Sequence, residues 1–209
     1  MVTLIVMGAS VGGVNALSTI FAALPASFPA PILAVMHVGA RNSVLPELLG
    51  KNSALPVRFA ETGEPVRAGC ILLAPPDRHM LVAGLAGQAT VELTLGPREH
   101  HTRPAIDPLF RSAAAAFGPA VAGVILSGYL DDGTAGLRAI KALGGKALVQ
   151  EPQEAPAPSM PQSALAHVEV DWRLPVAGMA AVLLALGGGR PGRTADDRRC
   201  AQPGRARLK

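Results

Sequence analysis

Short runs of consecutive apolar residues alternate along this chain with segments in which apolar residues recur at helical spacing. The first run covers residues 3–7, a segment with helical spacing follows at 14–24, and a second apolar run lies at 31–36. Continuous apolar runs of this length are typical of strands that are buried on both faces. Strand, helix and strand in this order predict a right-handed crossover between two parallel strands.

The same alternation returns in the second half of the chain. Helices that alternate with buried strands cover both faces of one sheet. We therefore expect an α/β fold, namely a three-layer α/β/α domain with a mostly parallel, doubly wound sheet. The pattern predicts helices at 107–117, 134–143, 161–167 and 175–186, and strands at 120–126, 146–150 and 168–170.

Between these two halves the pattern is less regular. A short helix is predicted at 43–49, but the apolar runs at 56–59, 70–74, 80–82 and 90–95 are short and are separated by glycine and proline. Short strands bounded by turn residues favour antiparallel pairing. We expect them to form a small antiparallel meander or hairpin inserted into the parallel core.

The net charge of +4 is unevenly distributed along the chain. From residue 187 onward seven basic residues stand against two acidic ones, so the preceding part is close to neutral. A near-neutral domain argues against a nucleic-acid-binding surface. The C-terminal segment starts with three glycines and shows no apolar periodicity. We expect one domain at residues 1–186 and a basic, disordered tail at 187–209.

The chain carries no recognisable targeting segment. Its apolar N-terminus is short, lacks a preceding basic region and runs directly into a glycine-rich turn, unlike a signal peptide. No segment approaches the roughly 20 apolar residues of a membrane-spanning helix. The two cysteines, Cys70 and Cys200, do not suggest a disulfide framework. We therefore expect a cytoplasmic protein.

Ser10 lies in the glycine-rich turn at residues 8–13, between the first predicted strand and helix. Ligands bind at this carboxyl edge of an open parallel sheet, and a helix N-terminus favours developing negative charge. The spacing is one glycine short of a dinucleotide-binding turn, so nucleotide binding is one hypothesis. The second predicted strand, however, ends in His37 rather than in an acid that could hold a ribose. This difference favours a serine nucleophile that faces a histidine base.

A third residue is needed to orient the imidazole of such a pair. Asp131 and Asp132 follow the buried run at 120–126 and precede the helix predicted at 134–143, so both can reach the same edge of the sheet. Either aspartate could instead cap that helix. The local spacing decides neither between a catalytic and a capping role nor between the two aspartates.

The ordered motifs resemble the catalytic domain of the chemotaxis protein-glutamate methylesterases (CheB-type). The resemblance runs from about residue 3 to 186. Several motifs in one order are more specific than any one of them alone. They are the segments at 8–13, 74–80, 103–112, 126–133 and 160–164, together with the strand-final His37.

The resemblance implies a Ser-His-Asp triad, with Ser10 as nucleophile, His37 as general base and Asp132, rather than Asp131, as the orienting acid. It also implies hydrolysis of glutamate methyl esters on the cytoplasmic helices of chemoreceptors, and deamidation of glutamines as a second activity. No cofactor or metal is implied. Because His100 and His101 lack evident ligand partners, we expect no metal site there.

Several positions around the expected cleft depart from the family's usual pattern. Val11 stands in place of a threonine, Tyr129 and Leu130 in place of Met-Gly, Thr102 in place of a histidine, and residues 38–42 also differ. Backbone N–H groups near Val11 and Tyr129 are expected to bind the oxyanion. The departures leave two alternatives open, an esterase for another substrate and a non-catalytic binding module.

The resemblance also implies partners. Methyl-accepting chemoreceptors would be the protein substrates. The chain begins at the first predicted strand, so we expect it to lack the family's usual N-terminal receiver domain. A separate receiver-domain protein is therefore a candidate regulator. We expect that the chain does not bind nucleic acid. We also expect that it has no membrane-spanning segment.

Overall fold

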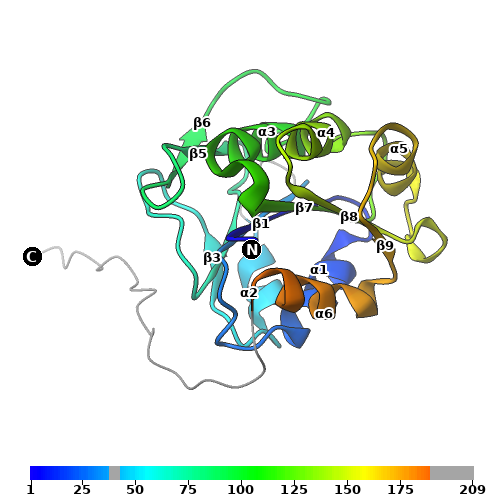
Figure 1. Ribbon diagram of the computed structural model, residues 1–209, viewed down its shortest axis with the longest axis horizontal. Helices are drawn as coiled ribbons and strands as arrows, with labels where there is room; N and C mark the ends of the chain where they lie inside the picture. The colour runs from blue at the N-terminus through cyan, green and yellow to red at the C-terminus, as the bar shows by residue number, and fades with distance from the viewer. Residues whose placement is uncertain (38–42, 189–209) are drawn as a thin grey trace, which may run out of the picture.

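The computed structural model describes residues 1–37 and 43–188, and these form a three-layer α/β/α domain (Figure 1). Seven of the described strands make one parallel sheet in the order β3-β4-β2-β1-β7-β8-β9. The predicted fold class is therefore confirmed. The strands are β1 (Leu4–Ala9), β2 (Ile32–Met36), β3 (Val57–Phe59), β4 (Ile71–Leu73), β7 (Val121–Ile125), β8 (Lys146–Gln150) and β9 (Trp172–Leu174).

Helices cover both faces of this sheet (Figure 1). One layer contains α1 (Gly13–Ala23), α2 (Leu45–Gly50) and α6 (Val176–Leu186), and the other contains α3 (Ile106–Phe117), α4 (Thr134–Ala142) and α5 (Ser159–His167). The sheet grows outward from β1 in both directions, through β2 on one side and β7 on the other. Ligands bind at such a switch point, outside the carboxyl ends of the strands.

The core consists of two apolar layers, one on each face of the sheet. All six residues of β1 are buried. Leu4 and Val6 belong to the layer shared with α3 and α4, whereas Ile5 and Met7 belong to the layer shared with α1 and α6. A strand that is buried on both faces needs apolar residues at successive positions. The continuous apolar runs of the sequence therefore identified the central strands.

The prediction for the region between α2 and α3 was partly wrong. β3 and β4 pair in parallel and extend the main sheet, and only β5 (His79–Ala83) and β6 (Thr90–Thr94) form the expected antiparallel hairpin. All three residues of β4 are buried, because this strand lies between β2 and β3. A three-residue apolar run is too short for its pattern to distinguish parallel from antiparallel pairing.

The last strand also differs from the prediction, because it covers Trp172–Leu174 and not residues 168–170. Val168 still belongs to the end of α5, since its N–H donates to the carbonyl of Ala164 at 2.9 Å. The chain then crosses to the edge of the sheet, where the Asp171 N–H donates to the carbonyl of Ala147 in β8 at 3.0 Å. Regular pairing with β8 therefore begins one residue later.

Two predicted features fall on residues outside the described ranges. The predicted basic tail lies outside them from residue 189 onward, and so do the unusual residues 38–42. In the part of the chain that the structure describes, no helix combines the length and hydrophobicity that a membrane span requires.

Gly133, the N-cap of α4, has a φ of 92°, and a Cβ atom there would collide with Ile125 and Ile106. We expect Gly133→Ala to lower the free energy of unfolding by about 2–5 kcal/mol, because it combines left-handed backbone strain with overpacking. Urea unfolding followed by circular dichroism measures this loss. The matched control is Gly63→Ala, since Gly63 has a φ of 85° with open space around its Cβ position. Equal losses in the two variants would contradict the packing contribution.

Candidate active site

Ser10 lies just beyond the carboxyl end of β1, the strand from which the sheet grows in both directions. Its N–H donates to the carbonyl of Ser127, which follows β7, at 2.9 Å. The turn enters α1 through Gly12, whose φ of 81° is left-handed and whose missing Cβ leaves room for the Ser127 hydroxyl. That hydroxyl donates to the carbonyl of Val11 at 2.7 Å. The loops after β1 and β7 are thereby fastened together around Ser10.

His37 follows β2 and Asp132 lies in the loop after β7, so they approach Ser10 from the two neighbouring strands. His37 Nδ1 is 3.1 Å from Ser10 Oγ, and His37 Nε2 is 2.7 Å from Asp132 Oδ2. With its proton on Nε2, the imidazole donates to the carboxylate and accepts from the serine hydroxyl. The three residues singled out in the sequence therefore lie in one hydrogen-bonded chain.

The carboxylate of Asp132 is buried, with 1% of the residue exposed, and is held on both oxygens. Oδ2 accepts from the Ile106 N–H at 2.7 Å and Oδ1 from the Asp107 N–H at 3.0 Å. Burial raises the pKa of Asp132, but the hydrogen bonds from His37 and the two N–H groups, with the charge of His37, outweigh burial and lower the pKa from its usual value. Asp132 is therefore a fixed anion beside the imidazole.

The structure separates the two adjacent aspartates that the spacing left equivalent. The Asp131 side chain is 62% exposed, whereas Asp132 points into the site. The N-cap of α4 is Gly133, and no side chain caps it. Asp131 contributes only its carbonyl to the start of this helix, by accepting from the Thr134 N–H at 3.0 Å. The geometry therefore does not support a capping role for either aspartate side chain.

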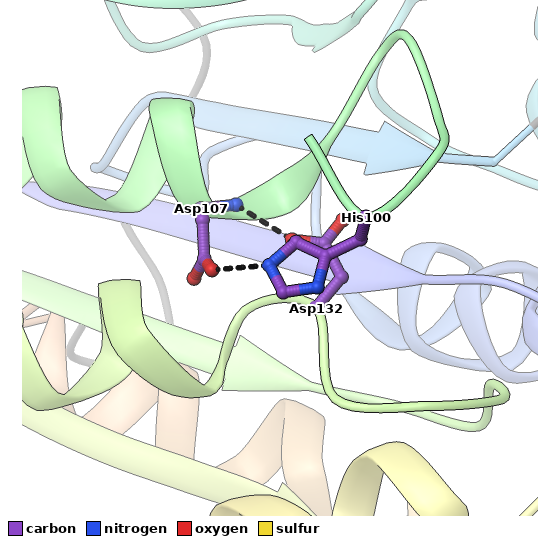
Figure 2. Close-up of side chains that lie close together, drawn as sticks. All are labelled: His100, Asp107 and Asp132. Carbon is purple, nitrogen blue, oxygen red and sulfur yellow. Dashed lines mark hydrogen bonds and ion pairs between the residues drawn. The ribbon is translucent and has the colours of Figure 1, made fainter. Parts of the chain in front are cut away.

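A second histidine, His100, lies behind Asp132 (Figure 2). His100 Nε2 is 2.9 Å from Asp107 Oδ2 and 3.8 Å from Asp132 Oδ1, and Nδ1 is 3.2 Å from Asp131 Oδ1. Asp107 is itself buried, and its Oδ1 accepts from the Gly136 N–H at 2.6 Å. The sequence-based expectation that His100 lacks partners was wrong. The fold brings the segment before α3 against the loop after β7. The spacing of residues along the sequence does not predict this contact.

The charged groups in this cluster shift one another's pKa values. Burial lowers the pKa of His100, but the hydrogen bond to Asp107 and the charges of Asp132, Asp107 and Asp131 outweigh it, so the net shift is upward. Burial and the charge of Asp132 raise the pKa of Asp107, whereas the hydrogen bonds from Gly136 and His100 lower it. The net shift of this pKa is upward. Two buried carboxylates thus repel each other, and a protonated His100 is placed to offset their charge.

Ligand atoms of His100, Asp107 and Asp132 all lie within 4.8 Å of one another, a spacing that could hold a metal ion. The carboxylate oxygens, however, already accept hydrogen bonds from His37 and from backbone N–H groups at the starts of α3 and α4. Donors of this kind satisfy buried carboxylates without an ion. We therefore interpret the cluster as a hydrogen-bond network.

The remaining positions singled out in the sequence either border Ser10 and His37 or support the fold. Tyr129 follows Gly128, whose Cα packs so closely that a Cβ there would lie 2.8 Å from the Ser10 Cβ. Thr102 Oγ1 lies 3.4 Å from His37 Nε2. His79, which belongs to the motif at 74–80, is buried away from this chain of contacts. Its Nδ1 accepts from the backbone before α3 at 3.2 Å, and its Nε2–H donates to a loop carbonyl at 2.9 Å.

Comparisons with known proteins agree with this fold. A family profile described as CheB methylesterase matches residues 5–183. A protein-glutamate methylesterase/protein-glutamine glutaminase of Anaeromyxobacter dehalogenans is 39% identical over 176 residues, which are 84% of this chain and 50% of that protein. A Leptospira interrogans protein whose name gives the same two activities is 37% identical over 183 residues, which are 87% of this chain and 93% of that protein.

A solved structure shows the same architecture. The crystal structure of the Thermotoga maritima CheB methylesterase catalytic domain matches with a TM-score of 0.85 and 31% sequence identity. The match covers 89% of this chain and 99% of that one. A family profile that spans most of the chain, relatives above 30% identity and a shared fold all lead to one assignment. The chain belongs to the CheB methylesterase family.

Proposed function

We propose that this protein is a serine hydrolase that removes methyl groups from glutamate methyl esters of another protein and deamidates glutamines there. The observation that carries this proposal is the hydrogen-bonded chain of Ser10, His37 and Asp132 at the carboxyl edge of the sheet. The names of relatives at 37–39% identity include both activities. In this proposal Ser10 is the nucleophile, His37 the general base and Asp132 the residue that orients the imidazole.

In the proposed mechanism both proton transfers run through one nitrogen of His37, the one that faces Ser10. His37 Nδ1 takes the proton of Ser10 Oγ while Oγ attacks the ester carbonyl, and then gives it to the leaving methoxide, so methanol departs and an acyl-enzyme remains. Water then gives a proton to the same nitrogen as it attacks the acyl carbonyl, and that proton passes to Ser10 Oγ when the acyl–Oγ bond breaks. The released carboxylic acid ionises to the glutamate carboxylate. Asp132 keeps the proton on Nε2 and stabilises the imidazolium that forms in each step.

Two backbone donors are proposed to bind the oxyanion, the N–H groups of Val11 and Tyr129. Val11 directly follows the nucleophile at the start of α1, and Tyr129 follows the glycine that packs against Ser10 Cβ. Donors fixed in the backbone lose no free energy to reorganisation when the oxyanion forms. Each donor of this kind typically contributes about 10²- to 10³-fold to kcat.

Exposed apolar side chains on the loops that hold Ser10 and Asp132 favour a protein substrate over a small ester. Val11 is 48% exposed, Tyr129 58% and Leu130 63%. Leu130 also has a φ of 65°, a strained conformation for leucine. Apolar groups exposed next to a nucleophile are suited to contact with a polypeptide segment. We therefore propose that these three side chains contact the substrate protein around the modified residue.

This role can be separated from the chemistry with Leu130→Gly. Glycine relieves the backbone strain and removes the apolar contact, so we expect KM for a methylated receptor fragment to rise several-fold with kcat little changed. Hydrolysis of a small aryl ester should be unaffected. The measurements are steady-state methanol release and release of the aryl alcohol. An equal loss on both substrates would contradict a contact specific to the protein substrate.

The direct test of the proposed function is incubation of methylated chemoreceptor fragments with the protein. Methanol release is expected, and a serine-directed phosphonate should label the protein in competition with these fragments. Turnover of aryl esters without methanol release from receptor fragments would instead favour another ester substrate. A folded protein inert towards the phosphonate would favour a non-catalytic binding module.

The proposed substrate also defines the proposed setting of the protein. Methyl-accepting segments of chemoreceptors face the cytoplasm, so we place the protein there. A separate receiver-domain protein is proposed as its regulator, which affinity capture with phosphorylated and unphosphorylated receiver domains can test. The proposed chemistry uses only the side chains described above, backbone donors and water.

A further inference from the structure

His100 is held in a turn whose backbone conformation is unfavourable for histidine. Residues 99–102 form a tight turn in which the Thr102 N–H donates to the Glu99 carbonyl at 2.9 Å. The two central residues, His100 and His101, have φ values of 49° and 62°. Successive left-handed residues are typical of a type I′ turn, which asparagine and glycine adopt at lower cost than histidine. Strain of this kind persists where the surrounding contacts hold it in place.

The two histidines of this turn differ in what they contact. The side chain of His101 is exposed. The ring of His100 instead reaches Asp107 and Asp132 (Figure 2). It also reaches Asp131, whose Oδ1 is 3.2 Å from Nδ1. The strained turn thus places the His100 ring near Oδ1 of Asp132, whereas His37 contacts Oδ2 of the same carboxylate.

We propose that His100 is a positioning residue, which offsets the charge of the buried carboxylates of Asp107 and Asp132 and thereby sets the acid limit of the hydrolase activity. This inference rests on the proposed function, because His100 acts through Asp132 on the base His37. His100 is 3.8 Å from Asp132 and does not contact Ser10 in this network. Its effect is therefore electrostatic and indirect rather than chemical.

Charged and titratable groups face His100 from each element packed around it. The carboxylates outnumber the cations, so a protonated His100 is favoured, in agreement with the upward shift of its pKa. Asp107 on α3 and Asp131 and Asp132 in the loop after β7 face the ring directly. Glu99 and His101 flank His100 in the turn, and Glu99 is paired with Arg111 of α3 at 2.8 Å. His37, after β2, lies on the other side of Asp132.

The sign of the expected effect follows from the charges. A cation at His100 makes the cluster less negative, which disfavours protonation of His37. Removing that cation leaves Asp107 and Asp132 uncompensated, so His37 holds its proton to higher pH. A protonated His37 cannot accept the proton of Ser10, so activity is lost from the acid side.

The test is the pH profile of kcat/KM for His100→Asn, measured with the full-length chain. Asparagine tolerates positive φ and keeps a short polar side chain, but it carries no charge. We expect the acid limb to move up by roughly 0.5–1 pH unit, a three- to tenfold loss on that limb, with little change above it. His100→Lys, which restores a cation without an imidazole, should move the limb back towards the wild-type position.

His101→Asn is the matched control, because it makes the same substitution at the neighbouring left-handed position with an exposed side chain. It should leave the profile unchanged. A uniform loss of activity at every pH in His100→Asn with an unmoved limb would overturn the proposal, and so would an equal shift in His101→Asn.

A second readout separates this proposal from the proposed function. The protonation midpoint of the His37 ring can be followed by NMR of the imidazole C–H groups, which requires no turnover. If wild type hydrolyses no ester but His100→Asn still moves this midpoint upward, the proposed function fails and the electrostatic role of His100 stands. An unmoved midpoint in an active enzyme would overturn the role of His100 alone.

Discussion

Ser10→Ala is expected to abolish methanol release from methylated receptor fragments, with kcat lower by roughly 10⁵- to 10⁶-fold, the scale on which removal of a nucleophile acts in triad hydrolases. The substitution removes the Oγ atom that lies 3.1 Å from His37 Nδ1. The Ser10 N–H still donates to the Ser127 carbonyl, so the turn around it should keep its conformation. The thermal midpoint of unfolding should therefore change little. Methanol release and labelling by a serine-directed phosphonate are the two measurements.

Ser127→Ala provides the control, because Ser127 is a buried serine whose carbonyl accepts from the Ser10 N–H. Its hydroxyl donates to the carbonyl of Val11 and accepts from the Ala157 N–H at 3.0 Å. These backbone contacts give the hydroxyl a role in holding the two loops together rather than in the reaction. We expect this variant to lose about 1–3 kcal/mol of unfolding free energy through unsatisfied buried groups, yet still to react with the phosphonate. Labelling of Ser10→Ala, or steady methanol release from it, would exclude Ser10 as the nucleophile.

The fold was largely predictable because its central strands are buried on both faces. Runs such as the one around β1 leave no alternative to a parallel sheet once helical segments separate them. The failures occurred towards the two ends of the sheet, at the pair β3 and β4 and at β9. β4 is only three residues long, and β9 is preceded by an apolar residue, Val168, that packs in the core without belonging to a strand. Short edge elements are set by tertiary pairing rather than by local pattern.

The candidate site was predictable to the extent that it lies on strand ends. Ser10, His37 and Asp132 each follow a strand, and neighbouring parallel strands end at one edge, so topology alone predicts that they meet. His100 could not be found in this way, because its turn is far in sequence from any strand of the main sheet. Its role depends on how residues 99–102 fold against the loop after β7, which the chain's periodicity does not encode.

Asp132→Asn is expected to lower kcat by about 10³- to 10⁴-fold, because an amide cannot replace both oxygens of this carboxylate. If the amide NH2 faces His37, it also opposes the Ile106 N–H, and the ring must accept on Nε2 and carry its proton on Nδ1, where it cannot take the proton of Ser10. If the amide is flipped, its NH2 faces the Asp107 N–H and leaves two donors opposed. That opposition costs about 1–3 kcal/mol of stability. Either orientation therefore damages catalysis or folding.

Asp131→Asn is the matched control for this prediction, since it makes the same change one residue earlier on an exposed side chain. Measured above the acid limb of the pH profile, where the contact of Asp131 with His100 matters least, it should keep kcat within a few-fold of wild type. Steady-state kinetics and urea unfolding of both variants decide the matter. Comparable losses of kcat in the two would contradict the assignment of the orienting carboxylate to Asp132. A large loss confined to Asp132→Asn, with His37 carrying its proton on Nδ1 by ¹⁵N NMR, would identify the altered tautomer as the cause, because no other consequence of the substitution moves that proton.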